Sequence, residues 1–90
     1  MVLKSTITLK NRLGMHARPA ILLYELVQKY NSRVILRNNN HIEAEADSVI
    51  AMLMLDSEQG STIDIEVSGP DEVQALSAII SLFDSGFDEN

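Results

Sequence analysis

Alternation between apolar and polar residues marks segments of the chain as strands. In residues 3–9 and again in residues 62–67, leucine, isoleucine or valine alternates with residues that are mostly polar or charged. A period of two residues is typical of a strand with one buried face. Two further segments, Arg33–Arg37 and His41–Glu45, flank three asparagines, a residue type that tolerates the positive φ of tight turns. We therefore predict a hairpin there, and four strands in all.

Residues 17–30 follow a helical period instead. One side of the helical wheel is apolar and consists of Ala20, Leu23, Leu26, Val27 and Tyr30. Ile21 falls among the polar residues of the other side, so we expect its side chain to be exposed. Pro19 is tolerated only in the first turn of a helix, which places the helix start at or near His16.

A second long helix is predicted near the end of the chain. Its first turn is expected around Pro70-Asp71-Glu72, because proline and acidic residues suit that position, and Gly86 is expected to end it. Its core stripe is predicted to consist of Val73, Leu76, Ile79, Ile80 and Phe83.

The run from Ser48 to Leu55 is ambiguous, because a short apolar run fits either a buried strand or a helix. Alanine, methionine and leucine favour a helix and Ser48 is a good N-cap, so we predict a short helix. A short helix in so small a protein cannot bury all its sides. Part of this run should therefore form an exposed apolar patch.

The predicted elements have the order βαββαβα. Hairpin connections favour antiparallel pairing, and the polar positions of the strands favour a solvated second face. We predict an α+β fold, an open-faced β-sandwich in which a four-stranded antiparallel sheet carries three helices on one face. With 90 residues, the whole chain (1–90) is expected to form one domain.

Composition and charge exclude several function classes. The net charge of −6 argues against nucleic acid as a partner, because such binding needs a basic face. The absence of cysteine excludes disulfides and thiolate sites, and His16 and His41 lack the spacing of metal ligands, so we expect no metal or cofactor. The start of the chain turns polar at once, and the longest apolar run, Val49–Leu55, is too short to span a bilayer. We therefore expect a cytoplasmic monomer that is not bound to a membrane.

Candidate chemistry is concentrated in Gly14-Met15-His16-Ala17-Arg18-Pro19-Ala20. A histidine at the start of a helix lies close to backbone N–H groups, here those of Ala17 and Arg18, and to the positive end of the helix dipole. The Arg18 guanidinium adds a planar, charged fork that suits phosphate. Because a neutral imidazole is a competent nucleophile near pH 7, the segment predicts an anion site beside a nucleophile.

Other interpretations of these side chains stay open. His16 could simply be a helix N-cap or a packed loop residue, and His41, which follows the asparagines, is expected to be a solvated surface residue. Ser48 is expected to cap a helix, with a regulatory phosphosite as the alternative, since a helix N-terminus tolerates added negative charge. Met52 and Met54 suit either the core or an adaptable partner surface.

The segment Gly14–Ala20 resembles the active-site signature of HPr, the histidine phosphocarrier family of the bacterial phosphoenolpyruvate-dependent phosphotransferase system. The resemblance covers nearly the whole chain, because the order βαββαβα is similar to the fold of that family and Ser48 stands where the family has a regulatory serine. It implies that His16 is a phosphohistidine, phosphorylated on Nδ1, and that Arg18 steadies the phosphoryl group. It also implies a phosphoryl carrier rather than a stand-alone enzyme.

Further segments resemble the branch of this family that serves the nitrogen-related phosphotransferase system. They are Arg37-Asn38, Glu43-Ala44-Glu45-Ala46, Ser48-Val49-Ile50-Ala51, Leu53-Met54-Leu55-Asp56-Ser57 and the stretch 82–89. This branch resemblance implies that the phosphoryl group arrives from the nitrogen-branch enzyme I and leaves to the nitrogen-branch enzyme IIA. By position and expected exposure, the candidate docking residues for these partners are Ile21, Val49, Ile50, Leu53 and Met54.

Three alternatives remain at the level of function. HPr of the sugar-transporting system needs the same active site, so the active site does not separate the two branches. A docking regulator would act without phosphotransfer. A stand-alone enzyme is disfavoured, because the chain has one candidate nucleophile and no glycine-rich nucleotide loop.

Asp47 departs from the family pattern, and its charge disfavours a phosphate on Ser48.

Overall fold

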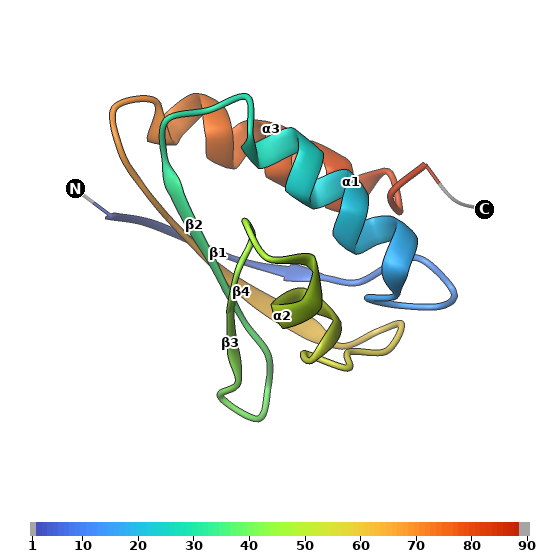
Figure 1. Cartoon of the computed structure of the whole chain (residues 1–90). Coiled ribbons are helices and arrows are strands. Elements are labelled where there is room, and N and C mark those ends of the chain that lie inside the picture. The colour runs from blue at the N-terminus through green and yellow to red at the C-terminus, as the bar shows by residue number, and fades with distance from the viewer. Residues whose placement is uncertain (1, 89–90) are drawn as a thin grey trace.

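The computed structural model describes residues 2–88 and has the predicted order βαββαβα (Figure 1). The strands are β1 (Val2–Thr8), β2 (Arg33–Arg37), β3 (Glu43–Glu45) and β4 (Thr62–Ser68). The helices are α1 (Ala17–Val27), α2 (Val49–Leu53) and α3 (Glu72–Asp84). No helix of this part of the chain combines the length and apolar character needed to cross a membrane.

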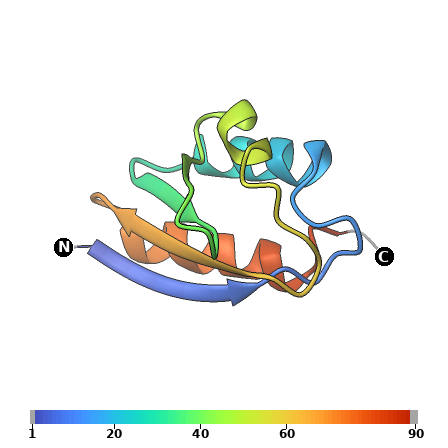
Figure 2. The same ribbon diagram turned by 90° about the horizontal axis from the view of Figure 1, so that it is seen from below.

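The strands form one sheet in the order β1-β4-β2-β3, and all neighbouring strands are antiparallel. The long helices α1 and α3 lie side by side over the sheet, and the short α2 packs against α1 and β3 (Figure 1). In the view from below, β1 and β4 lie on one side of the molecule and α1 and α2 on the other (Figure 2). The predicted open-faced α+β sandwich is therefore confirmed.

The two faces of the sheet differ in chemistry, as the alternation predicts. The covered face contributes fully buried residues such as Leu36, Ile63 and Ile65 to a core shared with the helices. The open face carries polar pairs instead, including an Arg37–Glu66 ion pair of 2.7 Å and a hydrogen bond of 2.7 Å from the hydroxyl of Thr6 to Asp64. Pairs of this kind on a solvated face, including the partly exposed Arg37–Glu66 pair, add little stability each.

The ambiguous segment is a helix, as predicted. The Ser48 hydroxyl oxygen accepts a hydrogen bond of 3.2 Å from the Ala51 backbone N–H, which makes Ser48 the N-cap of α2. Met52 is fully buried, whereas Ile50 is 75% exposed and Met54 68% exposed. The helix therefore buries one side only, and the expected apolar patch is present.

Four of the five residues predicted for the core stripe of α3 belong to the core or pack against it, and only Val73 of the five does not. Val73 is 65% exposed, and the buried positions of α3 are Ala75, Ile79 and Phe83. These residues recur every four positions and so lie on one side of the helix. Alanine is a weak hydrophobic signal in a sequence, which is why Ala75 was missed and the larger Val73 was chosen.

The predicted strand His41–Glu45 is shorter in the structure and begins at Glu43. The backbone of His41 has φ +63°, a left-handed conformation that a strand cannot contain. The Asn38 side-chain oxygen accepts hydrogen bonds from the N–H groups of Asn40 and Ile42, at 2.9 and 3.0 Å, and so shapes this turn. The positive φ falls on the histidine rather than on the asparagines.

Candidate functional site

The turn between β1 and α1 is held by hydrogen bonds within the turn and to Ser57. The Asn11 side-chain amide donates a hydrogen bond of 2.7 Å to the Gly14 carbonyl, and the Asn11 carbonyl accepts one of 3.1 Å from the Gly14 N–H. The Met15 N–H donates to the Ser57 carbonyl at 2.9 Å. These bonds fix the backbone immediately before His16.

Gly14 is required in this turn for two reasons. Its φ is +66°, in the region that residues with a side chain rarely adopt. A Cβ at this position would also lie 2.1 Å from the Ser57 carbonyl oxygen. The close approach of the two backbones therefore depends on a residue without a side chain.

His16 lies between two buried residues, Met15 and Pro19, and is itself partly exposed. It is the N-cap of α1, and its carbonyl accepts the Ala20 N–H at 3.1 Å. Its side chain makes no capping hydrogen bond. The N-cap interpretation therefore applies to the His16 backbone, while the ring is not used to cap the helix.

The start of α1 provides groups that suit an anion. Because α1 begins at Ala17, the N–H groups of Ala17 and Arg18 lie in the first turn, where no intrahelical acceptor exists. Arg18 is exposed, and the positive end of the helix dipole lies at the same place. The structure thus places His16, Arg18 and these amides within one turn of the chain.

The apolar residues predicted as docking positions are distributed over α1 and α2, which pack against each other. Ile21 is exposed on α1, as expected. Ile50 and Leu53 are exposed on α2, and Met54 is exposed at its C-cap. Val49 is partly buried and packs against the core, so it offers less surface than the other four.

Leu13 is a further exposed apolar residue near His16, and the hydrophobic pattern did not mark it. It is 70% exposed in the turn before His16. Its signal was a single apolar residue inside an otherwise polar turn, Lys10-Asn11-Arg12, which gave no periodicity to interpret.

Ser48 and His41 are placed as predicted by their simpler interpretations. The Ser48 hydroxyl is partly buried and occupied in capping α2, and the exposed Asp47 precedes it. His41 is exposed in the turn between β2 and β3, where its N–H donates to the Asn38 carbonyl at 3.1 Å.

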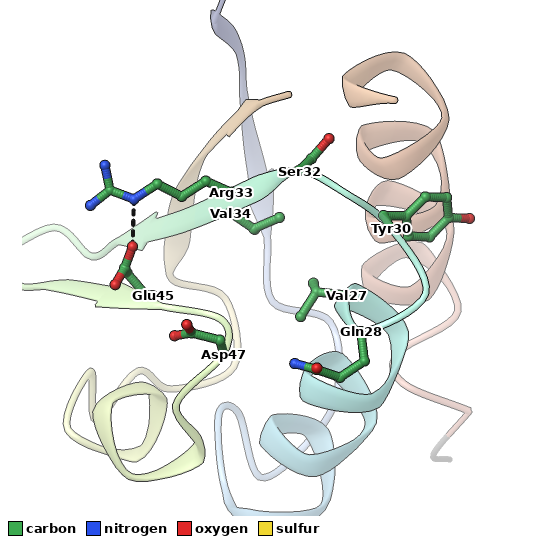
Figure 3. Close-up of a pocket in the computed structure, with 8 residues that line it drawn as sticks. All are labelled: Val27, Gln28, Tyr30, Ser32, Arg33, Val34, Glu45 and Asp47. Atoms are coloured by element: carbon green, nitrogen blue, oxygen red, sulfur yellow. Dashed lines mark hydrogen bonds and ion pairs between the residues drawn. The ribbon is translucent and has the colours of Figure 1, made fainter. Parts of the chain in front are cut away.

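A hollow of about 220 Å³ lies at the far end of α1 from His16 (Figure 3). Val27 and Gln28 of the α1 end, β2 and residues 45 and 47 surround it. Arg33 already donates to Glu45 at 2.5 Å across its rim. The hollow is separate from the cluster around His16, because the length of α1 lies between them.

Comparisons with known proteins point in one direction. Residues 3–85 match the family model described as PTS HPr component phosphorylation site. The chain is 67% identical to phosphocarrier protein NPr of Proteus mirabilis over 93% of each protein, and 56% identical to phosphocarrier protein NPr of Escherichia coli K12 over the full length of both. It is also similar to the crystal structure of HPr-C-His from Thermoanaerobacter tengcongensis, with a TM-score of 0.90, 32% identity and 98% of each chain covered.

Proposed function

This chain belongs to the HPr family of phosphotransferase-system phosphocarriers, and from that premise we propose that His16 carries the phosphoryl group. The observation that supports this most is the placement of His16 as a partly exposed N-cap whose ring does not cap the helix. Partners of a phosphotransferase-system carrier are proteins of the enzyme I and enzyme IIA kind. A partly exposed residue can be reached by both.

The chemistry needs only the residues of this one turn. The Nδ1 lone pair of His16 attacks the phosphorus of the phosphorylated donor, so a new N–P bond forms as the bond from phosphorus to the donor breaks. The Arg18 guanidinium and the N–H groups of Ala17 and Arg18 interact with the phosphoryl oxygens. The same step in reverse, onto the acceptor protein, releases His16.

We further propose that the carrier works in the nitrogen-related branch, receiving phosphate from the nitrogen-branch enzyme I and passing it to the nitrogen-branch enzyme IIA. The identity levels support this assignment: 67% and 56% to relatives named NPr, against 39% and 34% to relatives named HPr. Sugar-branch HPr is the alternative that this assignment must exclude.

The exposed side chains of Ile21, Ile50, Leu53 and Met54, with the partly buried Val49 beside them, are proposed as the docking surface for these partners. Ser48 lies at the start of the same helix. Because its hydroxyl caps α2 and Asp47 adds a negative charge next to it, we propose capping as the main role of Ser48 and regulation as the secondary one.

The branch is tested by labelling the purified chain with phosphoenolpyruvate and each enzyme I in turn. We expect a higher kcat/KM with the nitrogen-branch enzyme I. A higher kcat/KM with the sugar-branch enzyme would reverse the branch assignment and leave the phosphocarrier role intact.

The docking-regulator alternative is tested by His16→Ala. We expect this variant to lose phosphoryl acceptance and also its effect in cells. A variant that accepts no phosphate and still regulates would support a role by docking alone.

A further inference from the structure

Leu13 is the one large apolar side chain of the turn before His16 that is left exposed in the described structure. It is 70% exposed, whereas Met15, two residues on, is 4% exposed. Burial of a leucine removes a large apolar area from water. An exposed leucine is common on protein surfaces, so its position and surroundings must decide whether it has a role.

The turn holds Leu13 in a defined place. Its neighbour Gly14 is bonded to Asn11 through both its N–H and its carbonyl, and Met15 is bonded to the Ser57 carbonyl. The backbone that follows Leu13 is therefore held in place by hydrogen bonds to Asn11 and Ser57. An apolar group that is already ordered costs less entropy to bury on binding than one on a mobile loop.

Leu13 also lies within reach of any protein that covers His16. They are three positions apart in the chain, so their Cα atoms are at most about 11 Å apart. A protein–protein interface covers roughly 600–800 Å² on each partner, which corresponds to a disc with a radius of about 14–16 Å. A contact area of this size centred on His16 is therefore large enough to include Leu13.

The charge of residues 10–18 differs in sign from that of the whole molecule, although the acidic residues Glu58 and Asp84 lie close to this segment. Residues 10–18 contain Lys10, Arg12 and Arg18 and no acidic residue, although the net charge of the chain is −6. Lys10 is paired with Asp84 at 3.3 Å, and Arg12 and Arg18 are exposed. A partner that is complementary to this turn carries acidic groups at the rim of its contact.

We infer that Leu13 is an apolar docking anchor for the proteins that exchange phosphoryl groups with His16, and that each such protein offers an apolar hollow with an acidic rim next to its own phosphorylated side chain. This inference rests on the proposed role of His16. It adds a second contact region, on the turn before α1, to the apolar side chains of α1 and α2.

The test compares Leu13→Ser with Leu13→Met and with a control, Val73→Ser. Val73 is 65% exposed and lies at the start of α3, whose other end, at Asp84, pairs with Lys10. The control therefore removes a comparable exposed apolar group from the opposite end of that helix. Each variant is assayed for phosphoryl transfer from phosphorylated enzyme I and for labelling by phosphoramidate, a small donor that requires no docking surface.

For Leu13→Ser we expect the KM for the carrier to rise about tenfold with kcat little changed, and Leu13→Met to restore most of the loss. Val73→Ser should transfer as the unaltered chain does. Equal KM values for Leu13→Ser and the unaltered chain would overturn the inference. So would loss of phosphoramidate labelling in Leu13→Ser, because Leu13 would then act on His16 and not on docking. If the unaltered chain took no phosphate from either donor, the proposed function itself would fail.

Discussion

Gly14 determines where the backbone enters the first turn of α1, because its positive φ and its close approach to Ser57 place Met15 and His16. We expect Gly14→Ala to destabilise the fold by about 2 kcal/mol or more, since it combines a strained φ with a Cβ that lies 2.1 Å from a carbonyl oxygen. Urea denaturation measures this loss.

Gly60→Ala is the matched control for Gly14→Ala. Gly60 has φ +89°, but a Cβ there would meet nothing within 4 Å, so only the strain of roughly 1 kcal/mol is expected. Equal losses for the two variants would show that the contact with Ser57 is not tight. Phosphoryl transfer should fall in Gly14→Ala alone.

Arg18 is expected to act through the shape of its guanidinium as well as its charge. Arg18→Lys keeps the charge but not the planar fork, so we expect the rate of phosphoryl transfer to fall about tenfold, with a larger fall for Arg18→Gln. Rapid-quench kinetics with phosphorylated enzyme I measures these rates. Transfer by Arg18→Gln at the unaltered rate would mean that the backbone amides of the helix start suffice.

At the scale of elements, α2 depends on its cap because it is only five residues long. Ser48→Ala leaves the first turn of α2 without a side-chain acceptor and should lower the free energy of unfolding by about 1 kcal/mol. Ser48→Asp retains an acceptor and should lose less. If thermal unfolding gave Ser48→Ala the stability of the unaltered chain, the cap would contribute nothing to folding.

The elements show what a sequence can and cannot predict. The strand β1 and the helix α1 begin within one residue of their predicted starts, because periodicity and Pro19 mark them directly. The prediction that Val73 is buried was wrong, because a hydrophobic pattern favours large side chains, whereas the buried residue in the first turns of α3 is the small Ala75. The late start of β3 depends on the φ of His41, which hydrogen bonds to Asn38 impose and no hydrophobic pattern records.

At the scale of the whole molecule, Asp71 ties the start of α3 to the connection between α1 and β2. Its carboxylate accepts hydrogen bonds from the Ser32 hydroxyl at 2.5 Å and from the Asn31 N–H at 2.9 Å. These bonds hold the pKa of Asp71 below its ordinary value of 3.8, and the bond from Ser32 has the larger effect. A carboxyl group with a lowered pKa adds stability above its unfolded pKa and loses it as the pH falls.

We therefore expect the free energy of unfolding to decrease as the pH falls below about 4, and this decrease to be smaller in Asp71→Asn. Urea midpoints measured from neutral pH down to about pH 2 give the comparison. Asp88→Asn, which removes an exposed carboxyl group from the turn after α3, is the control. If the urea midpoint of Asp71→Asn fell with pH in parallel with that of the unaltered chain, the hydrogen bonds to Asp71 would not cause the loss of stability in acid.

The site itself was predictable only where its parts are close in sequence. His16, Arg18 and the helix start lie within one turn, so their joint position follows from local rules. The contact between Met15 and Ser57 joins residues 42 positions apart (57 minus 15), and α2 beside α1 likewise results from packing. These long-range features decide how firmly His16 is held and what surface surrounds it.

The central claim is that the phosphoryl group resides on His16. The most direct measurement is mass spectrometry of the chain after incubation with phosphoenolpyruvate and enzyme I, applied to the unaltered protein, His16→Ala and the control His41→Ala. We predict an acid-labile, base-stable phosphate on a peptide that contains residue 16, present in the unaltered protein and His41→Ala and absent in His16→Ala. Phosphate retained by His16→Ala, or found on another residue, would contradict the account.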